Sequence, residues 1–278
     1  MPADTDALDR SAQLARFLEK VEQQLVTQGL LRTDGGGPDV PYDADDLAEN
    51  FATIALYEEY TTRGGRIIAR QTESVLHRWQ DPILLATHFG ETVPMEQRQA
   101  DRAATGRYVA RLSRITGHPM RLTRGDANFD LFIVNDDERR ALGPELERLL
   151  PGISDAAVRA VTEMPRSTLC LVFAHDPGDD GVYTRAVAVV RAEHPDLLRL
   201  SCIHEELAQG LGLSNDSPDA RPSIFNDDEE FALLTSHDEK LLQMLFDPRL
   251  EPGMDLATAT PIIDQIAAEL LPDTQAMN

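Results

Sequence analysis

Residues 202–216 contain the side chains whose types and spacing come closest to a catalytic or metal-binding motif. The run is Cys-Ile-His-Glu-Glu-Leu-Ala-Gln-Gly-Leu-Gly-Leu-Ser-Asn-Asp. His204 and the glutamate after it begin the pattern H-E-x-x-H, in which two histidines one helical turn apart bind zinc. The second histidine would fall at Ala208, which offers no metal ligand, so this frame fails. We expect His204 to support the site from the start of a helix, satisfied by the backbone or by a carboxylate.

A frame shifted by one residue matches more of a longer pattern, H-E-x-x-H-x-x-G-x-x-H followed by an acid. Glu206 takes the place of the general-base glutamate, Gly212 that of the glycine after the helix, and Asp216 that of the trailing acid. In this respect the run resembles the active-site helix of metzincin peptidases. If the chain is an enzyme, the resemblance implies that Glu206 is its catalytic base.

The three positions that hold histidine in metzincins hold Glu205, Gln209 and Asn215 here. Residues four apart lie on one face of a helix, so Glu205 and Gln209 should point into the same space. Glycine adopts positive φ without steric cost, so the chain can turn sharply at Gly212. We then expect Asn215 to return to the same point.

These three side chains suit zinc poorly, because zinc prefers nitrogen and sulfur ligands and two of the three are neutral amides. Their oxygens suit calcium better, but calcium usually takes about six to eight oxygens, so Asp216, Asp227 and Asp228 would have to contribute. We therefore expect a hydrogen-bonded polar cluster without a cofactor, with weak Ca or Zn binding as the alternative. Without a metal-bound water, Glu206 alone would be a poor hydrolytic base.

A second segment, residues 232–246, resembles the C-terminal helix of the metzincins. Thr235 suits the N-cap of this helix, and Asp238 follows three residues later, close to a capping box. His237, in the first turn, is expected on the surface.

Residues 222–227 occupy the place of the methionine turn, which lies under the metal in metzincins. The segment contains no methionine. Ile224 or Phe225 would have to supply the apolar floor of the site, and Asp227 follows them as a supporting acid.

A closer resemblance rests on the run at 202–216 together with Pro-Ser-Ile-Phe-Asn-Asp and Asp-Pro-Arg-Leu-Glu-Pro-Gly-Met. These phrases are similar to those of an uncharacterised proteobacterial family of predicted exported proteins and lipoproteins, grouped at a distance with metallopeptidases. The resemblance covers roughly residues 40–256. It implies a zincin-like fold and a periplasmic or secreted location, and it implies no activity or substrate.

The two cysteines, Cys170 and Cys202, lie in segments that should face the core. Two buried free thiols and one disulfide both fit this pattern, because distance and geometry decide whether cysteines pair. A disulfide would place the working compartment outside the cytosol.

An alternation of strands and helices must position these residues. Apolar periodicity predicts strands at 83–89, 129–134, 168–173 and 186–190, and helices at 5–29, 95–116, 143–163 with a break near 151, and 197–211. A further helix is predicted to begin after Asp43 or Asp45 and to be broken by Gly64 and Gly65. The order of elements favours an α/β (α+β) fold with a zincin-like mixed sheet, a long active-site-type helix and an N-terminal helical arm. We divide the chain into an N-terminal helix and linker (1–38), a metzincin-like domain (39–256) and a C-terminal helix and tail (257–278).

Composition narrows the range of partners. The chain has 278 residues, with 26 Lys and Arg against 48 Asp and Glu, a formal charge of −22. Phosphate backbones repel such a chain, so we expect no nucleic-acid partner. No run approaches the roughly 20 apolar residues of a transmembrane helix. The first residues are polar and acidic, which predicts that the sequence carries no signal peptide, either because the protein is cytosolic or because a leader was removed.

These features predict a metallopeptidase-like exported protein whose zinc-binding histidines are replaced. It would bind a peptide or protein partner rather than catalyse, with an extended peptide adding to an edge strand near residues 168–190. Two alternatives remain. One is a hydrolase with an atypical oxygen-ligand metal site and Glu206 as general base; the other is a structural or assembly factor of the cell envelope.

Overall fold

The computed structural model describes residues 5–63, 66–226 and 228–272. This part of the chain contains nine helices and nine strands. In chain order they are α1 (Thr5–Thr27), α2 (Ala44–Ala55), β1 (Tyr57–Arg63), β2 (Arg66–Glu73), β3 (Arg78–Trp79), β4 (Ile83–Phe89), α3 (Met95–Thr116), β5 (Met120–Leu122), β6 (Phe129–Val134), α4 (Asp136–Arg140), α5 (Gly143–Leu149), α6 (Asp155–Thr162), β7 (Cys170–His175), β8 (Val182–Tyr183), β9 (Arg185–Arg191), α7 (Asp196–Gln209), α8 (Ser236–Leu245) and α9 (Leu256–Leu270).

A five-stranded sheet in the order β5-β4-β6-β9-β7 forms the centre of the fold. Strands β5, β4, β6 and β9 are parallel, and β7 runs antiparallel to β9 at one edge. This arrangement confirms the predicted mixed α/β sheet. The smaller sheets are the hairpin β1-β2 and the short parallel pair β3-β8.

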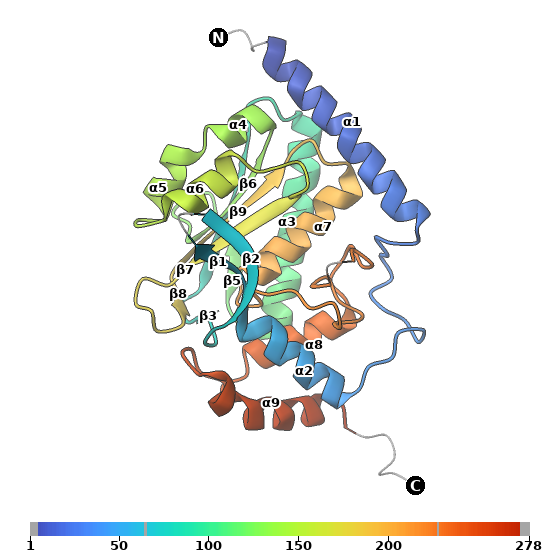
Figure 1. Cartoon of the computed structure of the whole chain (residues 1–278), viewed down its shortest axis with the longest axis vertical. Helices are drawn as coiled ribbons and strands as arrows, with labels where there is room; N and C mark the ends of the chain where they lie inside the picture. Colours follow the sequence, from blue (N-terminus) through green and yellow to red (C-terminus); the bar gives the residue numbers. More distant parts are fainter. Residues whose placement is uncertain (1–4, 64–65, 227, 273–278) are drawn as a thin grey trace.

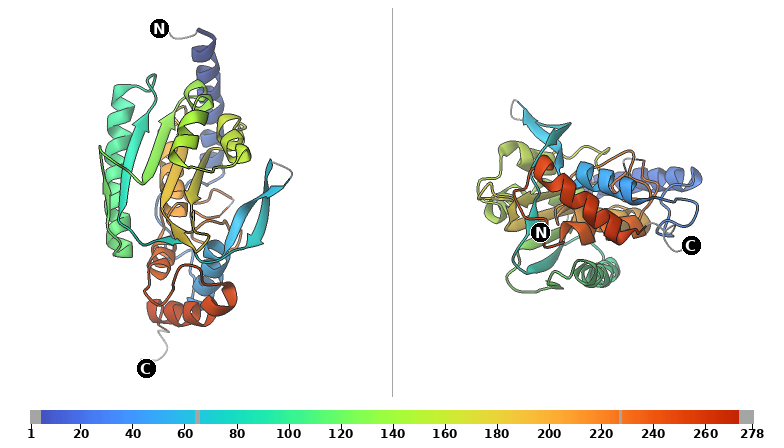
Figure 2. Two further views of the ribbon diagram at one scale, coloured as in Figure 1. Left: turned by 90° about the vertical axis from the view of Figure 1, so that its left-hand side faces the viewer. Right: turned by 90° about the horizontal axis from the view of Figure 1, so that it is seen from below.

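Helices cover both faces of the central sheet (Figures 1 and 2). Helices α3 and α7 pack on one face with the larger core, to which α2, α8 and α9 also contribute. Helices α4 to α6 lie on the other face, around Phe132, Val187 and Val189. Every residue of β6 is buried, as expected of a central parallel strand covered on both sides.

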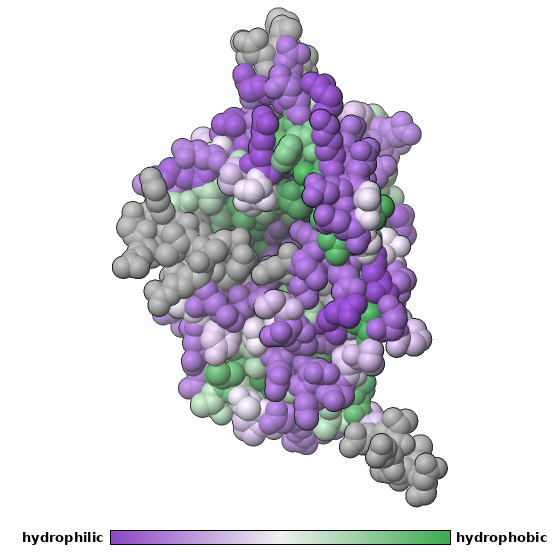
Figure 3. Space-filling view, turned by 45° about the vertical axis from the view of Figure 1, so that its right-hand side comes forward, coloured by the Kyte–Doolittle hydropathy of each residue, from purple (hydrophilic) through white to green (hydrophobic). Residues whose placement is uncertain are grey.

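Helix α1 packs along the outside of the molecule near the start of α7 (Figure 1). Leu14 and Leu18 of this helix are buried, and the Glu22 carboxylate accepts a hydrogen bond from the backbone N–H of Leu198 in α7. None of the helices in the described ranges is long and apolar enough to cross a bilayer. The visible surface is largely hydrophilic, with a hollow whose inner wall is more hydrophobic (Figure 3).

The predicted helix from Asp43 to Gly64 is wrong in its second half. A capping box between Asp43 and Asp46 starts α2 as expected, but the helix ends at Ala55 and the chain continues as β1. Strand β1 pairs antiparallel with β2. Two threonines and two tyrosines in β1 favour a strand, and a Gly-Gly pair between two such runs is itself a hairpin signal.

Candidate functional site: a cavity between an edge strand and α7

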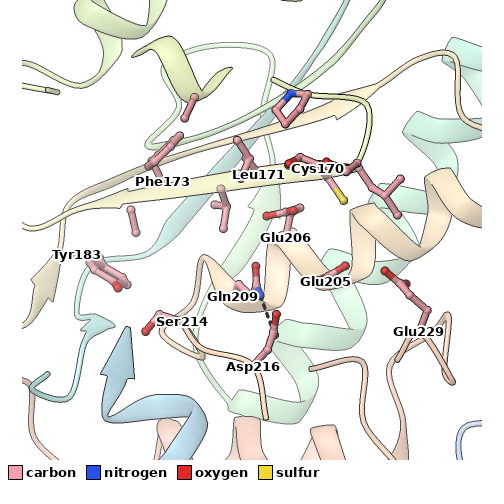
Figure 4. Close-up of a pocket in the computed structure, with 17 residues that line it drawn as sticks. Cys170, Leu171, Phe173, Tyr183, Glu205, Glu206, Gln209, Ser214, Asp216 and Glu229 are labelled. Atoms are coloured by element: carbon pink, nitrogen blue, oxygen red, sulfur yellow. Dashed lines mark hydrogen bonds between the residues drawn. The ribbon is translucent and has the colours of Figure 1, made fainter. Parts of the chain in front are cut away.

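A cavity of about 490 Å³ lies between the edge strand β7 and helix α7 (Figure 4). Its apolar wall is built by β7, its polar wall is built by α7 and the chain that follows, and residues of neighbouring loops complete the lining. The lining residues are Ala160, Pro165, Ser167, Thr168, Leu169, Cys170, Leu171, Val172, Phe173, Ala174, Tyr183, Glu205, Glu206, Gln209, Ser214, Asp216 and Glu229.

Glu205, Glu206 and Gln209 line this cavity from one helix, and Asp216 joins them from the following loop. The Gln209 amide nitrogen donates a hydrogen bond to Asp216 Oδ1 at 3.2 Å, which links the helix to the loop. Glu206 is 3% exposed and lies on the side of α7 that faces β7 (Figure 4). The structure therefore brings together four of the acidic and amide residues that the sequence singles out.

Asn215 lies apart from this group, in contrast to the expectation that it returns to the same point. It is 2% exposed, and its side-chain amide donates to the backbone carbonyl of Thr53 in α2 at 2.9 Å. Its backbone N–H donates to the carbonyl of Ile54. Asn215 thus ties the loop after α7 to α2, while its neighbour Asp216 lines the cavity.

The turn that sends Asn215 in this direction depends on Gly212. Gly212 has φ +132°, which side chains disfavour, and its backbone N–H donates to the carbonyl of Gln209. The site of a β-carbon on Gly212 is occupied by the carbonyl oxygen of His77. The glycine is therefore required by backbone contact, independently of any metal.

The side chains at the three histidine-equivalent positions do not fit zinc. Glu205 and Gln209 line the cavity, but they offer a carboxylate and a neutral amide as metal ligands, where zinc prefers histidine nitrogen or cysteine sulfur. Asn215 is turned toward α2. Across the described residues, no three His, Cys, Asp or Glu side chains are grouped to hold a metal ion.

A disulfide joins Cys170 of β7 to Cys202 of α7, with the two α-carbons 5.9 Å apart. The sequence left open two free thiols or one disulfide, and the structure contains the disulfide. Because Cys202 precedes Glu206 by four residues, both lie on the same side of α7. The bridge thus fixes the two walls of the cavity to each other beside the buried glutamate, and it is consistent with an extracytoplasmic protein.

His204 lies in the second half of α7, so its expected position at the start of a helix is wrong, and it belongs to the core next to the site. Its ring stacks on Tyr108 of α3, with ring centroids 3.8 Å apart, and its Nδ1 accepts a hydrogen bond from the backbone N–H of Leu234. Burial lowers the pKa of His204 to about 3. The neutral ring therefore braces α7 against α3 and the segment before α8.

Ile224 and Phe225 are buried in the larger core and are not among the residues lining the cavity. Their segment is held by Asp238, whose carboxylate accepts from Ser223 Oγ and from the backbone N–H of Ile224. The same carboxylate accepts from the backbone and hydroxyl of Thr235, which forms the predicted capping box of α8. Asp227 lies outside the described residues.

His237 is buried, so its expected position on the surface is wrong. Its ring is fully enclosed and meets the edge of Tyr42, and its Nε2 lies 3.3 Å from the Asn50 amide nitrogen. Helix α2 packs over the first turn of α8, which single-helix periodicity could not show.

Sequence patterns did not reveal several residues that line the cavity, including Tyr183, Ser214 and Glu229. They come from loops and from the two-residue strand β8, where local periodicity carries little information. Among the described residues, the lining contains four acidic side chains.

Residues 44–265 match the family described as "Protein of unknown function (DUF2927)". The chain belongs to this family. The DUF2927 region includes β7, α7 and the disulfide, whereas α1 precedes it. Membership confirms the expected likeness to an uncharacterised family; the likeness to metzincins stays a prediction. No curated protein matches the chain.

Proposed function

We propose that this protein binds an extended peptide or protein segment in the cavity between β7 and α7 and does not cleave it. The observation that carries this proposal is the position of β7 at the edge of the central sheet, next to a cavity of about 490 Å³. An edge strand presents unpaired backbone N–H and C=O groups, which an added strand can pair with. The hairpin β1-β2 forms a separate sheet, and its strands do not pair with β7.

The charge of the cavity favours a basic ligand. Among the described residues that line it are four carboxylates, those of Glu205, Glu206, Asp216 and Glu229. A lysine or arginine of a bound peptide would gain a charge-assisted hydrogen bond to these carboxylates. Apolar side chains of the same peptide would pack against Leu171 or Val172 on β7.

The absence of catalysis follows from the chemistry of the helix. The spacing of Glu206 and Gly212 resembles a metzincin helix, but the ligand positions carry Glu205, Gln209 and Asn215, and Asn215 faces α2. A glutamate that lacks a metal-activated water is a weak hydrolytic base. The disulfide supports action in an exported compartment, periplasmic or secreted.

Peptide binding tests this proposal directly. The probe is an acetylated octapeptide of alternating valine and lysine, and calorimetry measures its affinity for the full chain. We expect saturable binding in the micromolar range, on the order of 10 μM. N-methylation of alternate residues along one edge of the peptide should abolish binding, and N-methylation along the other edge should leave it intact, because a strand pairs through one edge only.

Two results would overturn the proposal. Equal affinity of the two N-methylated peptides would exclude backbone pairing. Cleavage of the probe by the wild type but not by Glu206→Gln, with unchanged stability, would restore the hydrolase alternative. Otherwise Glu206→Gln should bind the probe within about threefold of wild type, because three carboxylates remain in the cavity.

A further inference from the structure

Strand β7 has one backbone edge paired with β9 and one open edge. In β9, the backbone N–H of Ala186 donates to a carbonyl oxygen next to the start of β6. Backbone groups alternate in direction along a strand, so the next residue, Val187, faces β7, where its register partner is Phe173. Val172 and Ala174, the neighbours of Phe173, therefore direct their N–H and C=O groups to the open edge. No strand in the described part of the chain pairs with β7 there.

The side chains of β7 alternate between the two faces of the central sheet. Cys170 points toward α7, to which the disulfide joins it, and Val172 and Ala174 pack against the same larger core. Phe173 packs against the other core, which α4 to α6 cover. Figure 4 shows Leu171 and Phe173 on the side of β7 opposite to the sulfur atom of Cys170.

The cavity at this edge has lining residues on both faces, and the two sets differ in chemistry. The four carboxylates lie on the α7 side of β7 (Figure 4), and they belong to Glu205, Glu206, Asp216 and Glu229. On the α6 side, the lining includes the apolar side chains of Ala160, Pro165, Leu171 and Phe173. A strand added at the edge would therefore have apolar surroundings on one face and acidic surroundings on the other.

We infer that the proposed site selects segments in which apolar and basic residues alternate, with the apolar residues on the α6 side and the basic residues on the α7 side. The inference rests on the proposed function, because it assumes a strand added to β7. Residues directly opposite each other on paired strands point to the same face. Ligand residues opposite Leu171 and Phe173 thus meet apolar side chains, and a ligand residue opposite Val172 meets the carboxylates. Apolar ligand residues therefore pack on Leu171 rather than on Val172.

Strict alternation matters because the side-chain period of a strand is two. A slip by one residue exchanges the two faces and places every lysine of the ligand among apolar side chains. Burying a charged group without a partner is costly, so only registers that differ by an even number of residues remain. An octapeptide that repeats Val-Val-Lys-Lys has both residue types in equal number on each face, so no register suits it.

Two peptides of equal composition and charge test the inference. One is the acetylated octapeptide of alternating valine and lysine, and the other is its isomer that repeats Val-Val-Lys-Lys. Calorimetry with the full chain measures both affinities at the same ionic strength, so general attraction of cations to an acidic protein contributes equally. We expect the isomer to bind at least about tenfold more weakly.

NMR of the complex shows which face each set of ligand residues meets. We expect nuclear Overhauser contacts from the valine methyl groups of the alternating peptide to the ring of Phe173. The lysine methylene groups of the peptide should instead contact the methyl groups of Val172.

A protein variant tests the apolar face separately. Leu171→Asn places a polar group on this face and should weaken binding of the alternating peptide about fivefold or more. The matched control is Leu84→Asn, the same change at a partly buried position of β4, which β6 and β9 separate from β7. The control should bind the peptide within about twofold of wild type. Thermal unfolding of both variants checks that they are folded.

The possible failures are distinguishable. Equal affinity of the two isomers, with the two N-methylated peptides still distinct, would overturn this inference and leave backbone pairing intact. Contacts from the valine methyl groups to Val172 in place of Phe173, or undiminished affinity in Leu171→Asn, would overturn it as well. Absence of binding by the alternating peptide would overturn the proposed function itself, and this inference with it.

Discussion

The α-carbon of Gly212 faces the carbonyl oxygen of His77 so closely that a β-carbon on residue 212 would lie 2.0 Å from that oxygen. Because the obstacle is backbone, it cannot rotate away. Gly212→Ala should therefore lower the free energy of unfolding by about 3 kcal/mol or more, from the clash and from strain at positive φ. Urea unfolding followed by the emission of Trp79, the one tryptophan of the chain, measures the loss.

Gly152→Ala is the matched control. Gly152 also has positive φ, at +88°, but nothing lies within 4 Å of the position of its added β-carbon. Only strain remains there, so a loss of about 1 kcal/mol is expected. If the two variants lost equal stability, the contact with His77 would be irrelevant.

The Cys170–Cys202 bridge is expected to stabilise the protein substantially. It closes a loop with a sequence separation of 32 residues, for which chain entropy predicts about 3–4 kcal/mol. The double variant Cys170→Ala/Cys202→Ala should lose this amount in guanidinium unfolding. Wild type measured with a reductant should match the variant. An unchanged midpoint after complete reduction would contradict the prediction.

Stability should fall with acid because two buried histidines are held neutral. The pKa of His204 is about 3 and that of His194 about 4 in the folded chain, against 6.5 when exposed. Below about pH 6.5 the unfolded state binds the proton first, so unfolding becomes easier as the pH decreases. Each histidine contributes a slope of about 1.4 kcal/mol per pH unit until its folded pKa is reached.

The variant His204→Phe separates the contribution of His204 to acid sensitivity from the contributions of other titrating groups. The phenyl ring can keep the stacking on Tyr108, and it removes the titrating nitrogen. Between about pH 6 and 4, the stability of this variant should depend less steeply on pH than that of wild type, by about 1.4 kcal/mol per unit. Chemical unfolding across this range tests it, and parallel curves for the two proteins would refute the assignment to His204.

Asp238 is the most heavily bonded carboxylate near the site. It is fully buried and accepts from Ser223, Ile224 and twice from Thr235. Asp238→Asn replaces one acceptor oxygen by an amide group that donates, and this group would face other donors. We expect the free energy of unfolding, measured in urea, to fall by about 2–4 kcal/mol. Asp255→Asn, at the exposed N-cap of α9, should cost much less. If the two variants lost similar free energies of unfolding, the buried hydrogen bonds of Asp238 would contribute little more than an exposed N-cap does.

Much of the fold follows from local patterns in the sequence. Three predicted features are confirmed: the apolar run of β6, the capping box at Thr235 and the break between α5 and α6. Each of them depends only on residues close together in the sequence. The hairpin β1-β2 was the main omission, since Tyr57 to Arg63 follows a well-capped helix whose end carries no local stop signal. Strand pairing is decided by tertiary context, which outweighs propensity.

The site was predictable only in part. Helical spacing places Glu205 and Gln209 on one wall of a cavity, and Asp216 returns to them. Spacing could not show that Asn215 turns instead to Thr53, because that direction depends on where α2 packs. The contact between Glu193 and Ser11 was equally hidden, because the two residues are distant in sequence and meet only where α1 docks.

The covalent link between β7 and α7 also sets how a ligand can enter. Since Cys202 lies one turn before Glu206, the helix cannot move away from the strand at that turn without breaking the bond. The width of the groove is therefore constant there, and a bulky guest cannot wedge it open. A strand added to β7, as proposed above, would therefore have to fit a spacing that cannot widen beside Cys170 and Cys202.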